Sequence, residues 1–322
     1  MKSLWSQRQR WAQDGRLYAV LSAAGFSLKA IFVKLAYAAG PVDALTLLAL
    51  RMGFALPLFL WLIRLSRKPG EARLGAADVG RVWLLALLGY YLSSLFDFYG
   101  LQYISSGLER LILYLYPTLV LLFQACLSRR LPGGRTVQAM AICYVGLGIA
   151  FMVDLGQTGH GTQLMTGAAW VFASAVTYAL YYLGTGAMVQ RIGSMRLAGL
   201  AGSASCILVL AHFLLSGHPA ALPQLPVAVW SNGALMALLS TALPIYWMAL
   251  AIQRMGAAQA AAVGSLGPVL TVFASWTLLG EPLSLLQLGG LGLVMLGVTR
   301  LKPGAPPRRA AAPVAKAVSC TP

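Results

Sequence analysis

Six charged side chains interrupt stretches of this chain that are otherwise apolar. They are Lys29, Lys34, Arg51, Asp97, Glu109 and Arg110. A charge at the centre of a membrane-spanning helix costs about 2.5 kcal/mol or more, so these residues are functional candidates by default. The chemistry that they could support is the binding of a charged solute or the carriage of a proton.

Lys29 and Asp97 lie deepest in their stretches. Lys29 is a candidate ligand for an anionic group, but it could equally be the partner of Asp97 in a structural ion pair, or a lysine neutralised by desolvation. Asp97 shares a helical face with Tyr90 and Ser94. It could carry a coupling proton, or it could permanently neutralise Lys29 or Arg51, and the permanent pair is the preferred interpretation.

The other charged groups are expected nearer the membrane surface. Lys34 is closer to the external end of its stretch and is expected to snorkel. Glu109 and Arg110 are expected near the external mouth. Arg110 would then act as a gate or contact lipid headgroups, or it would simply mark topology.

Aromatic residues are the second signal. Trp170, Ser174, Tyr178 and Tyr182 follow one another at four-residue steps. Such a stripe is about 18 Å long, which carries it through the membrane core rather than along one interface. We interpret it as the lining of a cavity, with core packing or an interfacial belt as the alternative. The predicted substrate contacts are Lys29, Tyr90, Ser94, Asp97, Tyr114, Trp170, Tyr178, Tyr182, Tyr246 and Trp247.

Three prolines fall inside apolar stretches. Pro117, Pro244 and Pro268 each remove a backbone hydrogen bond from their helix. We predict that they act as hinges or gating points.

The elements that must position these residues are ten apolar stretches, each close to the length that spans a bilayer. We predict spans at 17–38, 43–63, 80–100, 106–127, 136–154, 164–188, 195–215, 227–250, 256–279 and 284–301. The fold class is therefore an all-α polytopic membrane protein. The segment 1–16 is expected to be cytoplasmic, and 302–322 to be a disordered cytoplasmic tail.

Basic residues occupy every second connection, whereas the alternate connections hold acids and His160 and His218. Lys and Arg are retained on the cytoplasmic side, so both termini are predicted to be inside. The formal net charge of +16 is spread beside the apolar stretches. It therefore suits an anionic membrane leaflet and not nucleic acid.

Composition and motifs restrict the function classes. The chain is 59% hydrophobic and only 10% charged, far from the roughly 25% charged residues of a soluble domain. No hydrolase, metalloprotease or nucleotide-binding motif is present, and the three histidines lack metal-ligand spacing. We predict no enzyme activity, no cofactor and no metal. An intramembrane enzyme acting on a lipid and a non-transporting membrane scaffold remain the alternatives.

The two halves align at an offset of about 151 residues. This offset matches Pro117 with Pro268 and Gly146 with Gly297. Because each half contains five predicted spans, the second half would enter the membrane from the opposite side. Inverted repeats of this kind are typical of secondary transporters.

The sequence after the ninth span, Gly280-Glu281-Pro282, together with Leu50-Arg51, Gly146 and Gly297, resembles the EamA-type drug/metabolite transporter superfamily. One departure is Arg130, which stands where the first half would carry the equivalent of Glu281. The resemblance covers nearly the whole chain, with five-helix repeats at 17–154 and 164–301.

The resemblance implies a multi-pass inner-membrane carrier that exports a small metabolite, amino acid or drug by alternating access. Its expected partners are the small-molecule substrate and the lipid bilayer, with protons as an open alternative. The expected assembly is a monomer or a weak homodimer.

Overall fold

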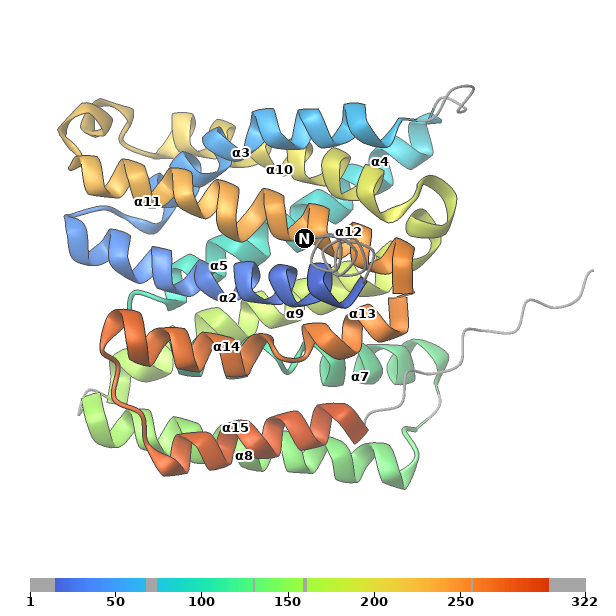
Figure 1. Cartoon of the computed structure of the whole chain (residues 1–322), viewed down its shortest axis with the longest axis vertical. Helices are drawn as coiled ribbons and strands as arrows, with labels where there is room; N and C mark the ends of the chain where they lie inside the picture. The colour runs from blue at the N-terminus through green and yellow to red at the C-terminus, as the bar shows by residue number, and fades with distance from the viewer. Residues whose placement is uncertain (1–14, 68–73, 130, 159–160, 256, 301–322) are drawn as a thin grey trace, which may run out of the picture.

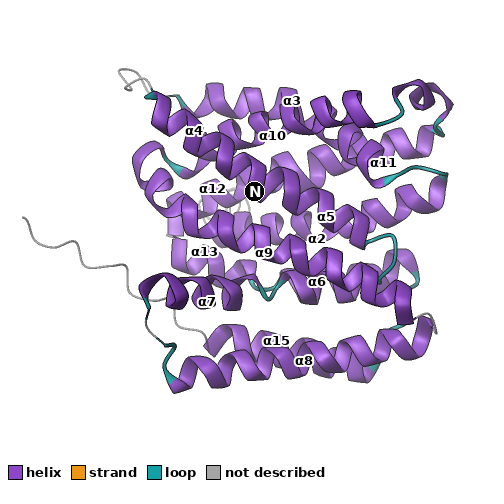
Figure 2. Ribbon diagram, turned by 180° about the vertical axis from the view of Figure 1, so that it is seen from behind, coloured by secondary structure: helices purple, strands orange, loops and turns teal. Residues whose placement is uncertain are grey.

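The computed structural model describes residues 15–67, 74–129, 131–158, 161–255 and 257–300, and within these ranges every regular element is a helix. Figures 1 and 2 show the helices running in roughly one direction or its reverse, as one bundle. Eight helices within the described ranges are long and apolar enough to cross a membrane. They are α2 (Gly15–Ala39), α3 (Ala44–Ser66), Ala76–Gly100, Ser106–Ser128, α8 (Gly134–Thr158, apolar over Gly134–Gly156), α9 (Gly161–Ile192), α10 (Ser194–Ser216) and Val227–Met255. The prediction of a polytopic all-helical membrane protein is confirmed.

The count of ten spans is not confirmed. The predicted ninth span, 256–279, is divided into α13 (Ala257–Gly264), α14 (Gly267–Ala274) and η4 (Ser275–Leu279). The predicted tenth is α15 (Leu285–Arg300), a helix of 16 residues. Both regions are apolar but shorter than a full spanning helix. The predicted N-terminal segment lies almost wholly, and the C-terminal tail wholly, outside the described residues.

Two spans contain a π-helical segment at corresponding places. In Ala76–Gly100 the segment η1 (Ala86–Leu92) separates α4 (Ala76–Leu85) from α5 (Ser93–Gly100). In Val227–Met255 the segment η3 (Leu238–Ala242) separates α11 (Val227–Ala237) from α12 (Leu243–Met255). The two π segments are related by the same offset of about 151 residues that aligns the halves of the sequence.

Serine side chains satisfy carbonyl groups just beyond each π segment. Ser174 on α9 donates its hydroxyl to the carbonyl of Ser93 at 2.7 Å. Ser22 on α2 donates to the carbonyl of Pro244 at 2.8 Å. Hydroxyl groups commonly replace hydrogen bonds that an irregular turn or a proline removes from a membrane helix. Pro244, which we predicted to act as a hinge, is buried, and its carbonyl group is hydrogen-bonded to Ser22 of the neighbouring helix α2.

The predicted hinge prolines Pro117 and Pro268 begin new helices after a break. Pro117 lies in the first turn of α7 (Tyr116–Ser128), which follows α6 (Ser106–Leu113). Pro268 lies in the first turn of α14. Proline is tolerated there because the first turn lacks intrahelical donors in any case. The two breaks, at 114–115 and 265–266, also correspond at the 151-residue offset.

The largest apolar core joins α2, α3, α5, α10 and α11, and it contains the fully buried rings of Phe59 and Phe98. A further segment, η2 (Pro219–Gln224), connects α10 to α11. Helices α8 and α15 form a separate closely packed pair, which lies side by side along one edge in both Figure 1 and Figure 2.

Glycines allow the α8–α15 pair to approach closely and in a reciprocal manner. A β-carbon at Gly146 would lie 2.5 Å from the carbonyl oxygen of Gly290, and one at Gly297 would lie 2.4 Å from the Cys143 sulfur. The Cys143 thiol contacts the carbonyl of Val294, which lies 151 residues along the chain. Gly146 meets residues 290–294 while Gly297 meets 139–143, so the two helices are antiparallel.

We expect Gly146→Ala to destabilise the protein, because its methyl group would collide with backbone atoms of α15. Overpacking of this kind typically costs about 1–3 kcal/mol. Thermal unfolding of the purified protein in detergent should show a lower Tm. Gly148→Ala is the matched control, because a β-carbon there meets no atom within 4 Å. Equal Tm values for the two variants would contradict close packing at Gly146.

Candidate functional site

The charged residues of the first three spans converge with the start of the fourth. The Lys29 ammonium on α2 lies 2.6 Å from Asp97 Oδ2 on α5 and 3.3 Å from Glu109 Oε1 on α6. Asp97 is 1% exposed and Glu109 is fully buried. One lysine therefore bridges two carboxylates from two other helices, and we call these three residues the ionic cluster.

Two arginines lie close to the ionic cluster without an ion pair to it within 4 Å. Arg51 on α3 is buried, donates Nε to the Thr241 hydroxyl at 3.0 Å, and lies over the Phe98 ring at 5.6 Å from its centroid. Its Nη1 is buried without a hydrogen-bond partner in the described part of the chain. Arg51 is thus anchored to the π segment η3 and to α5.

Arg110 on α6 is half-buried, and its Nε is likewise buried without a partner among the described residues. Its guanidinium lies beside Gly267, where a β-carbon would be 3.6 Å from Nη2 and 4.0 Å from Ser27 Oγ. The same guanidinium interacts electrostatically with Glu109 and with the phenols of Tyr114 and Tyr116. Arg110 therefore lies between the ionic cluster and a group of tyrosines.

These tyrosines pack ring against ring where α6, α7 and α9 meet. Tyr116 lies 5.2 Å from Tyr178 and 4.8 Å from Tyr182, measured between ring centroids. Tyr114 extends the group through Tyr116 at 6.3 Å, and Tyr181 does so through Tyr178 at 5.8 Å. Tyr182 is 43% exposed. We call Tyr114, Tyr116, Tyr178, Tyr181 and Tyr182 the tyrosine cluster.

A carboxylate clamp closes the bundle at the end where the connections carry acids. One oxygen of Glu281, which follows η4, accepts hydrogen bonds at 3.1 Å from both the backbone N–H and the hydroxyl of Ser106. The other oxygen accepts a hydrogen bond from Ser275. An anion at a helix N-terminus is favourable, because the first turn has unpaired N–H groups. Glu281 thus joins the ninth predicted span to the start of the fourth.

Next to this clamp lies a pocket of about 260 Å³. Its charged lining consists of Lys34, Asp154 and Glu281, and its polar lining includes Gln102 and Gln287. Lys34 is half-buried here among acids. The pocket is separate from the ionic cluster. Its lysine, Lys34, lies nearer the C-terminal end of α2 than Lys29 does.

The structure brings some of the predicted substrate contacts together and separates others. Lys29 and Asp97 meet in the ionic cluster, and Tyr114, Tyr178 and Tyr182 meet in the tyrosine cluster, with Tyr90 in edge contact with Tyr181 at 5.5 Å. Trp170 instead packs against Phe96 and Tyr99, with the rings tilted relative to one another. Ser174 is fully buried against Ser93. The residues of the stripe on α9 therefore contact different neighbours at different points along the helix.

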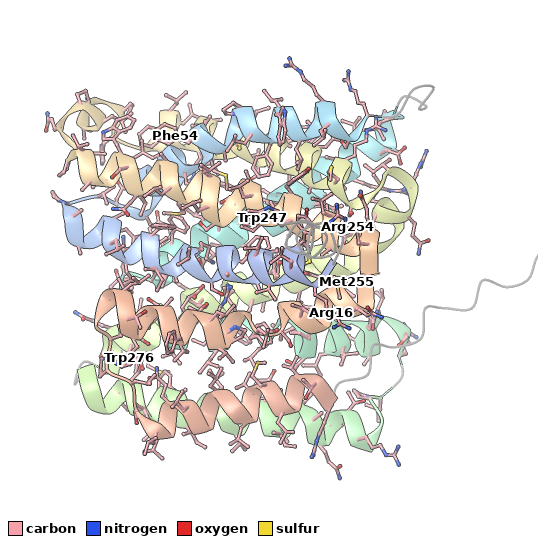
Figure 3. All side chains as sticks on the ribbon, in the orientation of Figure 1. Arg16, Phe54, Trp247, Arg254, Met255 and Trp276 are labelled. Carbon is pink, nitrogen blue, oxygen red and sulfur yellow. The ribbon has the colours of Figure 1, made fainter. Side chains whose placement is uncertain are left out.

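Three further predicted contacts lie elsewhere in the bundle. Tyr246 on α12 packs against the exposed ring of Trp61 at 6.0 Å. Ser94 and Trp247 are both half-buried. Figure 3 shows Trp247 in the middle of the bundle, while Arg16 and Arg254 lie together at the end where α2 begins. None of these three side chains belongs to the ionic cluster or to the tyrosine cluster.

The depth of Glu109 differs from expectation. The sequence placed it near the external mouth, but the N-cap Ser105 begins α6 one turn earlier, and the helix then carries Glu109 inward to Lys29. Its position one turn after a serine cap is the signal that could have revealed this. Among the described residues, no group of three or more His, Cys, Asp and Glu side chains could hold a metal ion.

A bundle of apolar helices around buried charges and phenols has the features of a polytopic membrane transporter. The EamA-like transporter family matches residues 14–152 and, a second time, residues 165–301. This chain belongs to that family, as its sequence motifs indicated.

Similar proteins carry the same general description. The uncharacterized transporter YcbK of Bacillus subtilis (strain 168) is 29% identical over 309 residues, which cover 94% of this chain and 97% of that protein. The uncharacterized transporter YyaM of the same organism is 25% identical over 285 residues, with 85% and 90% coverage. A solved crystal structure shares the fold, with a TM-score of 0.60 and 19% identity over 89% of this chain and 95% of that one.

Proposed function

We propose that this chain is a secondary transporter that moves a small metabolite, amino acid or drug across the inner membrane by alternating access. The observation that carries the proposal is the correspondence between its two family-matched halves. The π segments η1 and η3, the breaks before Pro117 and Pro268, and the glycines of α8 and α15 all correspond at one offset.

The reciprocal contacts between the halves support an inverted arrangement. Ser27 donates its hydroxyl to the carbonyl of Gly267 at 2.9 Å. At the 151-residue offset, Ser27 corresponds to Tyr178 and Gly267 corresponds to Tyr116. The rings of these two tyrosines are also in contact. A two-fold relation makes each contact occur twice. Because α8 and α15 are antiparallel, the axis of this relation would lie in the membrane plane, as in transporters with inverted repeats.

Export is the direction that we propose, on the basis of the clamp. Glu281 and Ser106 hold the two halves together at the predicted external end. Gln287 lies there too, within 2.8 Å of where a β-carbon on Gly107 would be. A contact that closes the outer end is compatible with loading from the cytoplasm, which is the first step of export.

Flux through proteoliposomes tests the function. Vesicles would be loaded with a metabolite extract, and the solutes released into the medium would be identified by mass spectrometry. We expect a small set of solutes to leave only when the protein is present. Hydrolysed lipid without solute release would favour the intramembrane enzyme, and no change of either kind would favour the scaffold.

The predicted orientation can be tested separately. Reporter fusions after Arg135, Arg196 and Arg308 should report the cytoplasm, and fusions near His160 and His218 should report the periplasm. The reason is the alternation of basic residues between successive connections. A periplasmic signal after Arg308 would contradict an even number of spans.

A further inference from the structure

We infer that the transported solute is a monoanionic carboxylate with a flat apolar body, bound with its carboxylate on Arg110 and its body against the tyrosine cluster. This inference rests on the proposed transport function and specifies its substrate class.

The first step is the pairing of charges in the bundle interior. The buried carboxylates of Asp97 and Glu109 are both directed at Lys29. Arg51 and Arg110 then have no carboxylate within 4 Å in the described part of the chain. An arginine side chain cannot be deprotonated in a protein, so both remain cationic. Protonation of either carboxylate would only increase the excess of positive charge.

The second step distinguishes the two arginines. Arg51 is 7% exposed and already has a hydroxyl partner and a ring beneath its guanidinium. Arg110 is half-buried, has no hydrogen bond or ion pair with any of the described residues, and lies beside Gly267, which offers no side chain. The guanidinium presents a planar fork of donors that suits a carboxylate. Arg110 is therefore the cation that remains for the solute.

None of the described groups around Arg110 forms an ion pair with it within 4 Å. From α6 itself the nearest acid is Glu109, which is bound to Lys29. From α2 the neighbour is the Ser27 hydroxyl, and from α7 it is the phenol of Tyr116. Lys34, Asp154 and Glu281 belong to the pocket at the bundle end, where Glu281 is held by Ser106 and Ser275.

The third step is the difference between the two halves. At the 151-residue offset the counterparts of Lys29, Asp97 and Glu109 are Leu180, Met248 and Ala260. The tyrosine cluster lies on α9, in the second half, and on the α6–α7 span that faces it. The first half thus contributes three basic and two acidic side chains to the centre, a formal net charge of +1, whereas the second half contributes three of the five tyrosines of the tyrosine cluster. Such a site suits a solute with one charged end and one flat apolar end.

Four probes with the same phenyl ring and two-carbon spacer test the inference. They are 3-phenylpropionate (anion), L-phenylalanine (zwitterion), 2-phenylethylamine (cation) and 2-phenylethanol (neutral). Binding to the purified protein would be measured by ligand-dependent Tm shifts and by titration for Kd. We expect 3-phenylpropionate to bind at least tenfold more tightly than each of the other three. Equal binding of the amine, the alcohol or phenylalanine would overturn the inference.

Variants assign the binding to Arg110. Arg110→Gln should weaken the binding of 3-phenylpropionate at least tenfold, and Arg110→Lys at least threefold, because a lysine gives a point charge rather than a planar fork. Arg300→Gln, at an exposed arginine of α15, is the matched control and should bind like the wild type. Should Arg110→Gln fail to fold, Arg110→Lys decides the question. Wild-type affinity in either folded variant would overturn the inference.

The outcomes also separate this inference from the transport function. If 3-phenylpropionate binds through Arg110 but no solute crosses the vesicles, the anion site stands and the proposed function falls. If Arg110→Gln transports its solute at the wild-type rate, the transport function stands and the anion site falls.

Discussion

Lys29→Met is expected to lower stability more than any other single substitution in the ionic cluster. Lys29 is the only ion-pair partner that the described residues give to Asp97 and Glu109. Without the ammonium group, two carboxylates would face each other with almost no access to water, since they are 1% and 0% exposed. Removing one partner of a buried ion pair typically costs about 3–5 kcal/mol. Thermal unfolding in detergent should therefore show a large loss of Tm.

Neutralising the acids provides the control. The triple variant Lys29→Met, Asp97→Asn, Glu109→Gln should recover most of the lost stability, because neither acid of the ionic cluster is then left buried without its lysine partner. Asp97→Asn alone should be less damaging than Lys29→Met, since Glu109 still pairs with the lysine. If Asp97→Asn folds well, abolishes pH-driven transport and keeps substrate counterflow, Asp97 carries the coupling proton and is not a fixed structural partner.

The partnership of Lys29 with Asp97 could be predicted from the sequence, but that with Glu109 could not. Charges near the centres of separate spans have few ways to be neutralised, so the sequence offered Lys29 and Arg51 as partners of Asp97, and the structure selects Lys29. Glu109 reaches Lys29 only because of where α6 begins relative to α2, and that depends on the cap at Ser105 and on packing between distant helices. A local sequence pattern does not specify how two distant helices are placed relative to each other.

The spans show the same limit. Apolar length and composition predicted the eight helices that are long enough to cross a membrane, because those are the properties that a bilayer selects, but not the shorter helices of the last two predicted spans. They did not predict that η1 and η3 would widen two of the helices, or that Ser22 and Ser174 would bond to the carbonyls beyond them. The prolines indicated where helices would break, yet Pro117 and Pro268 begin helices and do not bend them.

The aromatic stripe on α9 was likewise only partly predictive. Four-residue spacing places side chains on one face of a helix, but it does not say which neighbour that face meets. The structure assigns Trp170 to Phe96 and Tyr99, Ser174 to Ser93, and Tyr178 and Tyr182 to Tyr116. Only the last two members contribute to the tyrosine cluster beside Arg110.

Tyr182→Ala is expected to reduce transport at least tenfold while leaving Tm nearly unchanged. The ring is 43% exposed, so its removal opens little new cavity in the packed interior. It nevertheless faces Tyr116 at 4.8 Å and forms the open side of the tyrosine cluster, where the body of a solute would lie. Efflux from proteoliposomes, measured for a solute identified in the metabolite screen, gives the rate. Thermal unfolding of the same preparation gives the stability.

Two further variants test whether the effect of Tyr182→Ala comes from the loss of a ring that lines the transport path. Phe172→Ala removes a ring of similar exposure, 41%, from the same helix, and no ring contact is recorded for Phe172 within the described residues. It should leave the rate of efflux unchanged. Tyr178→Ala should lower both the rate and Tm, because Tyr178 packs against three other rings. If Tyr182→Ala and Phe172→Ala transport equally well, the tyrosine cluster is packing and does not line the path. A loss of folding in Tyr182→Ala would lead to the same conclusion, since a ring that lines an open path is not needed to hold the helices together.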